Sequence, residues 1–372
     1  MEVYGYGVPE EGASFVPVRF TREDVRPGEV AIDITHCGVC HSDLHQVDND
    51  WGNTNYPCVP GHEIAGVVTE VGEGVTKFSK GDRVGVGCMI NSCQQCEPCR
   101  SGNEQYCEGP KSATLTYNGP KKPDGTNSYG GYTDAIVVRE EFVLRIPDGL
   151  APEAAAPILC AGITTYQPMK HFGLKEGQTL GVAGVGGLGH MAIQIGKAMG
   201  AKVVALTTHP DKTQEIKNLG ADEVLVSTDE DAMADAAMSL DLMINTIPVP
   251  HDINAYVNLM KPSSTLVVVG NMMGFEKLES APLVFNRIGL HGSLIGGIED
   301  TQEVLDLCAR HNIAPELKIV QISDIESVYD DLRNGNPGFR HVLDMKAFED
   351  DTDARSRAKD IPAPTRGEVV GR

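Results

Sequence analysis

The segment QTLGVAGVGGLGHMAIQIGKAMGAKVVALTTH, residues 178–209, decides the fold of the second half of the chain. An apolar run leads into a glycine-rich turn, and Met191, Ile195 and Met199 then recur at helical spacing until Gly200, which is placed to end the helix. A second apolar run follows. Strand, helix and strand alternate further through DLMINTI and STLVVVG, so we expect an α/β fold with a doubly wound parallel sheet.

The glycine turn fits the pattern G-x-G-x-x-G of dinucleotide-binding sites. In that pattern the first glycine allows a tight turn, the second lets the backbone approach a pyrophosphate, and the third lets the helix pack closely. A glycine turn without a ligand is the alternative, but the position between an apolar strand and a helix favours a nucleotide. The predicted motif consists of Gly184, Val185, Gly186, Gly187, Leu188 and Gly189.

The end of the next strand indicates which nucleotide is bound. An NAD enzyme usually has an acidic residue there that accepts a hydrogen bond from the ribose 2′-hydroxyl. This chain has Thr207 and Thr208, followed by His209 and Lys212. Hydroxyl groups and a cation suit a 2′-phosphate, so NADP(H) is favoured over NAD(H). Asp211 keeps NAD as the alternative, although it lies past the strand end.

The first 150 residues have a different texture, rich in glycine and in short β-branched runs such as EIAGVVTEVGEGVTKFSKGDRVGVG. This pattern predicts short strands in a barrel-like β-rich domain. We place that domain at 1–153, a nucleotide-binding domain at 154–295 and a return to the first domain at 296–346. Residues 347–372 mix both charge signs and carry few apolar side chains, so we expect disorder there.

Composition excludes several classes of partner. The formal net charge of −21 over 372 residues argues against nucleic acid and anionic membranes. No run of 18 apolar residues is present, and the start MEVYGYGVPEEG lacks the features of a secretory signal. We therefore expect a cytoplasmic location, where the thiols of the 10 cysteines more often bind metal than form disulfides.

Four of the cysteines follow the spacing C-x2-C-x2-C-x7-C. Four thiolates fill the tetrahedral shell of zinc and leave no position for a substrate, so we predict a structural zinc site. Unbound cysteines are one alternative, and an iron–sulfur cluster is another, although the proline and three-residue spacing of the bacterial motif are missing. The predicted ligands are Cys93, Cys96, Cys99 and Cys107.

A second metal site is suggested by CGVCHSDLH at 37–45 and GHEIAG at 61–66. A catalytic zinc takes three protein ligands of mixed type and keeps one position open. Cys40 and His62 supply two candidate ligands, and a cysteine from elsewhere would supply the third. Residue types alone do not choose among Cys37, Cys58, Cys88, Cys160 and Cys308.

Several motifs resemble one family. GHE-x2-G-x-V at 61–68, VG at 71–72 and GD-x-V at 81–84, together with the cysteine cluster, resemble zinc-dependent medium-chain alcohol dehydrogenases. CGVCHSDLHQ, NDWG and LCAGITTY are similar to the cinnamyl alcohol dehydrogenase branch and its bacterial broad-range aldehyde reductase relatives. The resemblance spans residues from about 5 to 346, and it implies a GroES-like catalytic domain joined to a Rossmann domain.

The resemblance also assigns metal ligands. It implies that Cys40, His62 and Cys160 hold a catalytic zinc, which makes two zinc ions per chain. Glu63 would be a transient ligand, and Asp43 would orient the His62 ring. The alternative for both carboxylates is an ordinary solvated or paired side chain.

For the reaction, the resemblance implies reversible hydride transfer between NADPH and aromatic or aliphatic aldehydes. Ser42 would pass the alkoxide proton through the cofactor ribose to His45. Trp51 would shape the mouth of the substrate pocket, although a packing role is equally compatible. Leu115 stands where plant monolignol enzymes carry a tryptophan, which favours a broad aldehyde reductase over a dedicated lignin enzyme.

Two other functions are weighed against this one. A reductase of activated C=C or C=N bonds would depend less on zinc polarisation, and an NADPH-binding protein without catalysis would lack the zinc ligands. The zinc count discriminates, because only the dehydrogenase requires two ions per chain. The resemblance further implies a homodimer that pairs the sheet edges of the nucleotide domains.

Overall fold

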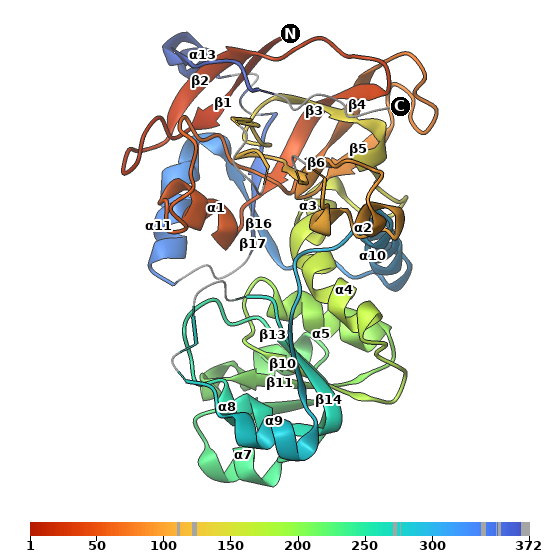
Figure 1. Ribbon diagram of the computed structural model, residues 1–372. Helices are drawn as coiled ribbons and strands as arrows, with labels where there is room; N and C mark the ends of the chain where they lie inside the picture. Colours follow the sequence, from red (N-terminus) through yellow and green to blue (C-terminus); the bar gives the residue numbers. More distant parts are fainter. Residues whose placement is uncertain are drawn as a thin grey trace. The chain divides into compact units, whose positions relative to one another are not determined.

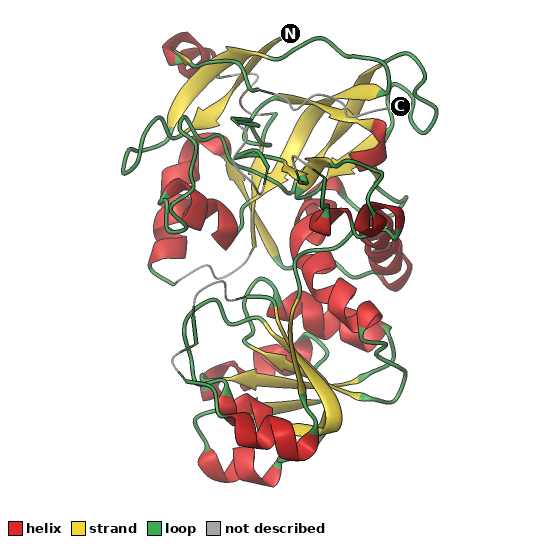
Figure 2. Cartoon of the chain, viewed as in Figure 1, coloured by secondary structure: helices red, strands yellow, loops and turns green. Residues whose placement is uncertain are grey.

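The computed structural model divides into two compact units. The first consists of Met1–Cys160, Gly297–Ala309 and Ala314–Arg372, and the second of Ala161–Gly296 and Arg310–Ile313. Strands dominate the first unit, whereas strands and helices alternate in the second (Figure 1, Figure 2). The residues that the structure describes are 1–109, 112–120, 125–270, 274–275, 277–335, 340–346, 348 and 351–365.

The main sheet of the first unit contains β3 (Glu29–Gly38), β4 (Ile64–Val71), β5 (Arg83–Val86), β8 (Ala135–Arg139), β9 (Leu144–Arg145), β16 (Leu317–Gln321) and β17 (Arg340–Asp344). The order is β16-β17-β3-β4-β5-β9, and β8 also pairs with β3. Only β16 and β17 run parallel among the described pairs. The β-branched runs predicted as strands thus form β4 and β5, and Val68, Val84 and Val86 are buried.

Smaller elements complete the first unit. Two short antiparallel pairs are formed by β1 (Glu2–Gly7) with β2 (Val16–Thr21) and by β6 (Met89–Asn91) with β7 (Thr114–Leu115). The helix α1 packs against α11, and α3 packs against β3 and β4. The helical elements are α1 (His41–Val47), α2 (Glu97–Arg100), η1 (Glu104–Tyr106), η2 (Glu140–Phe142), α3 (Pro152–Pro157), the π-helical η3 (Ile158–Gly162), α10 (Ile298–His311), η5 (Ile322–Asp324) and α11 (Ile325–Arg333).

The second unit is a parallel sheet with helices. Its strands are β10 (Thr179–Ala183), β11 (Lys202–Thr207), β12 (Glu223–Val226), β13 (Leu240–Asn245), β14 (Met260–Val268) and β15 (Gly289–Gly292). The order is β12-β11-β10-β13-β14-β15, with every neighbouring pair parallel. The chain thus leaves the central β10 first toward one edge and then toward the other, as in dinucleotide-binding sheets. The predicted α/β class is confirmed.

The helices of the second unit follow the alternation expected from the sequence. The helix predicted from Met191, Ile195 and Met199 is α5, and Gly200 follows it with a φ of 82°. Met191 and Ile195 are fully buried. The helical elements are α4 (Ile163–His171), α5 (Gly189–Ala198), η4 (Pro210–Lys212), α6 (Thr213–Asn218), α7 (Glu230–Asp235), α8 (Asn254–Val257) and α9 (Ser280–Asn286).

The C-terminal segment corrects one expectation. Disorder over 347–372 is wrong for residues 351–365, where α13 (Thr352–Arg357) and β18 (Lys359–Asp360) form. β18 pairs in parallel with β2, and the backbone N–H of Thr365 donates to the carbonyl of Asn127. The remaining parts of the predicted tail, apart from Phe348, lie outside the described residues.

Charged side chains explain why this polar segment is ordered. The Arg355 guanidinium lies 4.7 Å from the centre of the Tyr4 ring and 3.2 Å from a carboxylate oxygen of Asp134. Arg19 donates to Asp360 over 2.8 Å. Composition could not reveal this, because such order depends on where the partner charges lie and not on mean hydropathy.

Within the described residues, no helix combines the length and the apolar character needed to cross a bilayer.

Candidate functional site

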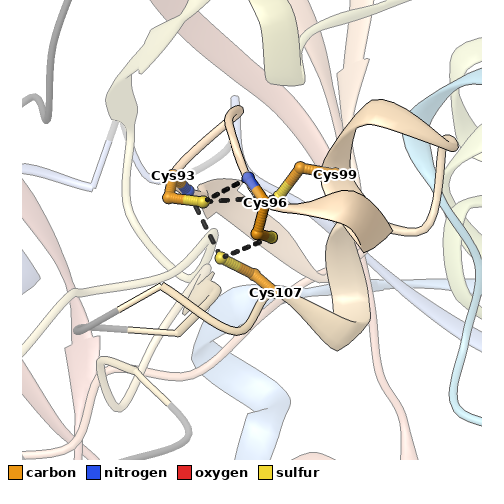
Figure 3. Close-up of side chains that lie close together, drawn as sticks. All are labelled: Cys93, Cys96, Cys99 and Cys107. Atoms are coloured by element: carbon orange, nitrogen blue, oxygen red, sulfur yellow. Dashed lines mark hydrogen bonds between the residues drawn. The ribbon is translucent and has the colours of Figure 1, made fainter.

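The four clustered cysteines meet in one lobe of the first unit. Figure 3 shows their side chains turned toward one another, and the four sulfur atoms all lie within 4.8 Å of one another. The Sγ atoms of Cys93 and Cys99 are 3.9 Å apart, and those of Cys96 and Cys107 are 4.0 Å apart. Tetrahedral zinc with Zn–S bonds of about 2.3 Å would separate its sulfur ligands by about 3.8 Å. The spacing therefore fits zinc.

Backbone amides point at these sulfurs. Amide N–H groups of Gln95 and Cys96 donate to Cys93 Sγ, and that of Gly109 donates to Cys107 Sγ, over 3.3–3.4 Å. Such donors stabilise thiolates, the form that binds metal. A side chain at position 109 would place its Cβ 2.7 Å from the Cβ of Cys93, so the tight approach requires glycine.

A second cluster joins Cys40, His62, Glu63 and Cys160, whose ligand atoms also lie within 4.8 Å of one another. Cys40 is the N-cap of α1, His62 and Glu63 precede β4, and Cys160 lies in the π-helical turn η3. The structure thus brings together all three ligands that the resemblance implies. Among the alternatives, Cys37, Cys58 and Cys308 are outside this set, as is Cys88.

The donor spacing of this second cluster also fits zinc. The two Sγ atoms of Cys40 and Cys160 are 4.0 Å apart, and His62 Nε2 lies 3.3 Å from Cys160 Sγ. A tetrahedral zinc would separate sulfur from sulfur by about 3.8 Å and sulfur from nitrogen by about 3.6 Å. Two sulfurs and one imidazole leave one position of such a shell open, unlike the four sulfurs of the lobe.

Asp43 joins the two ligand-bearing segments of this cluster. Its Oδ2 accepts from the backbone N–H of Cys40 over 2.9 Å, completing a capping box at the start of α1. Its Oδ1 accepts from the backbone N–H of Gly61 and lies 3.0 Å from His62 Nδ1. With Nδ1 as donor, the free nitrogen Nε2 faces the sulfurs.

Local electrostatics favour a metal or a proton at this cluster. A hydrogen bond from the Cys160 thiol holds the pKa of Cys40 well below its usual range, although burial acts in the opposite direction. Burial is the largest single effect on His62 and lowers its pKa, but the charges of Asp43 and Cys88 and the hydrogen bonds to Asp43 and Cys40 together outweigh it, and the net shift of the pKa is upward. A bound cation would take the place of these protons.

Glu63 has a partner that the sequence reasoning missed. Arg340 of β17 donates to Glu63 Oε1, and both side chains are buried. Burial raises the pKa of Glu63 to about 7, while Arg340 acts to lower it. The other oxygen, Oε2, has no hydrogen-bond partner among the described residues. A charged residue within the apolar strand sequence FRHVLDM was the available signal.

The proposed relay residues lie on one helix, but a third residue joins them. Ser42 and His45 are three positions apart on α1, which puts them on the same face. His45 Nδ1 is 2.7 Å from Asp50 Oδ2, and the Trp51 ring lies 5.6 Å from the His45 ring. Sequence reasoning missed Asp50, whose position five residues after His45 was the only signal.

The two residues expected in the substrate pocket, Trp51 and Leu115, lie in different surroundings. Trp51 contacts His45, next to the relay. Leu115 lies in β7 opposite Met89. Tyr117, two positions further on, has its ring 5.8 Å from that of His62 and donates from its hydroxyl to the Ser42 carbonyl. Tyr117 of this loop therefore lies beside the metal cluster.

The glycine motif of the second unit has the expected backbone geometry. Gly184 has a φ of 85°, directly after β10, and a Cβ at Gly189 would lie 1.9 Å from the Gly184 carbonyl oxygen. A Cβ at Gly186 would meet nothing within 4 Å, which leaves open space beside the backbone. Val185, Gly187 and Leu188 complete the turn into α5.

The residues expected to select the cofactor follow β11. Thr207 is buried at the strand end, and its Oγ1 accepts from the backbone N–H of His209. Thr208 and Lys212 are exposed and therefore accessible to a ligand. Asp211 is exposed as well and lies in η4, beyond the strand.

Comparisons with protein families match both units. Residues 26–148 match the alcohol dehydrogenase GroES-like domain, and residues 187–310 match the zinc-binding dehydrogenase family. "Probable mannitol dehydrogenase 1" of Stylosanthes humilis is 46% identical over 346 residues, which cover 92% of this chain and 96% of that protein. "Aldehyde reductase YahK" of Escherichia coli is 43% identical, with 94% and 100% covered.

Solved structures agree with the sequence relatives. A cinnamyl alcohol dehydrogenase from Sorghum bicolor superimposes with a TM-score of 0.88 at 38% identity, covering 93% of this chain and 98% of that one. A cinnamyl alcohol dehydrogenase from Helicobacter pylori, complexed with NADP(H), gives a TM-score of 0.83 at 38% identity, with 93% and 99% covered.

The fold and its two metal-competent clusters define a zinc-binding dehydrogenase. The chain belongs to the zinc-dependent medium-chain alcohol dehydrogenases, in the branch that contains the cinnamyl alcohol dehydrogenases and bacterial aldehyde reductases. It is accordingly an oxidoreductase that acts on the CH–OH group.

The two clusters should lose metal independently. We expect two zinc ions per chain in the wild-type protein. Cys160→Ala should retain one zinc ion and a nearly unchanged melting temperature. Cys99→Ala should also retain one zinc ion, but with a clearly lowered melting temperature, because structural zinc contributes folding free energy. Cys308→Ala, another buried thiol, is the control. Zinc measured by elemental analysis after gel filtration decides, and two ions retained in Cys160→Ala would contradict the assignment.

Proposed function

We propose that the chain reduces aromatic and aliphatic aldehydes reversibly with NADPH, with Cys40, His62 and Cys160 holding the catalytic zinc. The observation that carries this proposal is the mixed donor cluster, which leaves one coordination position for a substrate oxygen. Two thiolates and a neutral imidazole also leave the site near zero net charge. When bound, zinc polarises a carbonyl oxygen and lowers the pKa of an alcohol, and NADPH supplies the hydride.

The protein's own groups hold this arrangement. Asp43 keeps His62 in the tautomer that presents Nε2 to the metal position. Glu63, held by Arg340, lies close enough to act as a transient ligand during exchange. The Tyr117 ring lies beside that of His62, with the ring centroids 5.8 Å apart.

Protons are handled by α1. Ser42 is placed one residue into the helix to hold the proton of the alcohol, and His45 is partly exposed and able to exchange a proton with solvent. The Asp50 carboxylate, 2.7 Å from His45 Nδ1, orients the ring.

For the cofactor, Thr207, Thr208 and Lys212 support a preference for a 2′-phosphate. Lys212 and Thr208 offer a cation and a hydroxyl in an exposed position after β11. The similarity to a cinnamyl alcohol dehydrogenase complexed with NADP(H) supports the same preference. Asp211 does not end the strand, so it is poorly placed to bind a ribose 2′-hydroxyl.

The initial rate of cinnamaldehyde reduction, with NADPH and NADH at equal concentration, tests the proposal. We expect a fast rate with NADPH, and in Lys212→Ala a KM for NADPH raised roughly tenfold, because a charge-assisted hydrogen bond is lost. The KM for NADH should stay within about twofold. Lys217→Ala, an exposed lysine of α6, is the control.

The outcomes separate the parts of the proposal. Equal rates with both cofactors would overturn the NADP preference and leave the reaction class intact. No cinnamaldehyde reduction with either cofactor, together with activity on an activated C=C or C=N bond, would overturn the substrate class. Oxidation of mannitol but not of cinnamyl alcohol would instead indicate that the substrate is a sugar alcohol, as the name of the Stylosanthes relative states.

The relay predicts graded losses. Ser42→Ala should lower kcat by roughly 10²-fold, since a positioned proton-transfer group contributes about 10²–10⁴-fold. Asp50→Asn should lower kcat less, because the His45 ring loses the carboxylate that orients it. Asp148→Asn, a fully exposed carboxylate, is the control. Steady-state kinetics between pH 6 and pH 10 provide the measurement, and a near-normal kcat in Ser42→Ala would rule the relay out.

We further propose a homodimer formed through the second unit. β15 is the edge strand of its sheet, and α9 directly before it exposes Val284 and Phe285 by 74% and 86%. Exposed neighbouring apolar side chains beside an open sheet edge favour a protein interface.

We also propose a cytoplasmic location. It is supported by the ten cysteines, none of which forms a disulfide in the described residues.

The dimer is tested by sedimentation. The wild-type chain of 39.9 kDa should sediment with about twice that mass, and Phe285→Glu should shift it toward one chain, because a buried unpaired charge is costly. Met238→Glu, an exposed apolar residue of the same unit, is the control. A wild-type mass of one chain would contradict the proposal.

A further inference from the structure

A chain of buried hydroxyl groups extends the metal cluster into the protein interior. Asp43 is 0% exposed, and its Oδ2 accepts from the hydroxyl of Tyr132 over 3.4 Å, in addition to the Cys40 amide. The hydroxyl of Tyr132 is in turn 3.3 Å from the hydroxyl of Tyr329. Both tyrosines are completely buried, so water does not compete for these hydrogen bonds.

The proton directions in this chain follow from chemistry. A phenol has one proton to donate, and an ionised carboxylate can only accept. Because Tyr132 donates to Asp43, its oxygen accepts, and Tyr329 must be the donor to Tyr132. On the other side of the carboxylate, Oδ1 accepts from His62 Nδ1. The order Tyr329, Tyr132, Asp43, His62 therefore carries hydrogen bonds toward Asp43 from both ends.

We infer that Tyr132 and Tyr329 are positioning residues of the catalytic zinc site. The inference rests on the proposed function, because it concerns the same three ligands. The Tyr132 hydroxyl fills an acceptor position on Oδ2 and resists rotation of the carboxylate about its Cβ–Cγ bond. Without that contact the carboxylate turns more freely, and its hold on His62 Nδ1 and on the Cys40 amide weakens together.

Tyr329 connects this series of hydrogen bonds to the helix α11. It lies on α11, and Phe15 packs edge-on against its ring with the centroids 4.8 Å apart. On the same helix, Arg333 donates to both carboxylate oxygens of Asp48 over 2.8 Å and 3.2 Å. Asp48 is the C-cap of α1, the helix that Cys40 begins. α11 is thus attached to α1 at its end and to the zinc site through Tyr329.

The test is zinc release to an excess of a coloured chelator, measured on the holoenzyme. The structural site provides an internal reference, since its zinc has no connection to Asp43. We expect the catalytic zinc to leave roughly tenfold faster in Tyr132→Phe, at the lower end of the 10–100-fold loss seen when outer-shell partners of metal ligands are removed. Tyr329→Phe should have a smaller effect in the same direction.

A matched variant separates positioning from packing. Tyr129→Phe removes a hydroxyl from another buried tyrosine, whose ring packs against Phe20, and should leave both release rates unchanged. Cobalt substituted at the catalytic site gives a second readout, since a turned His62 ring alters the visible absorption spectrum. Each variant keeps its aromatic ring and the packing around it, so Tyr132→Phe, which removes a donor from Asp43, should show the largest fall in melting temperature of the three.

Each result decides one question. Catalytic zinc leaving Tyr132→Phe at the wild-type rate, with an unchanged cobalt spectrum, would overturn the inference and leave the proposed function standing. Equal acceleration at both zinc sites would also overturn it, since that is general destabilisation. A wild-type protein with only the structural zinc would instead refute the proposed function on which the inference rests.

Discussion

The candidate metal site of Cys40, His62 and Cys160 depends on one buried carboxylate, that of Asp43. An ionised carboxylate without water is costly unless donors surround it, and here four donors come from three segments of the first unit. Each donor is therefore held where the carboxylate requires it. Because two of these segments carry Cys40 and His62, the requirement of Asp43 sets the distance between the ligands before any metal arrives. Metal affinity in this arrangement reflects organisation of the folded chain as much as the ligand types.

Local chemistry was largely predictable from the sequence. The cysteine lobe and the glycine turn both involve residues close together in the chain, so spacing alone carries the information. The third ligand was not predictable in this way, because Cys160 is 120 positions from Cys40 and several cysteines were equally eligible. Only the family resemblance selected it. Arg340, Tyr132 and Tyr329 are further cases, since a buried tyrosine in a core looks the same in sequence whether or not its hydroxyl meets a carboxylate.

The fold class followed from periodicity, whereas the ends of the elements and the last segment did not. Repeated apolar runs and helix-ending glycines predict the parallel sheet, and both are local patterns. The ordering of 351–365 depends instead on Tyr4, Arg19 and Asp134, which lie more than 200 residues earlier in the chain. Low apolar content indicates that this segment has few apolar side chains with which to build a core of its own. Composition does not reveal that residues elsewhere in the same chain provide a surface to which this segment binds.

The interruption of the first unit by the second has a consequence for biosynthesis. Arg340 follows Glu63 by 277 positions, and at about 5–20 residues per second the ribosome needs roughly 15–55 s to add them. During that interval Glu63 is already part of the nascent chain, but Arg340, its partner on β17, has not yet been added. Tyr329 is also missing for most of this time. The cysteine lobe, in contrast, is complete after Cys107. The nascent chain can therefore complete the four-cysteine lobe early, whereas Arg340 and Tyr329, which support the second metal cluster, are added only near the end of synthesis. Zinc loading of the two clusters in the cell should then occur in two separate stages.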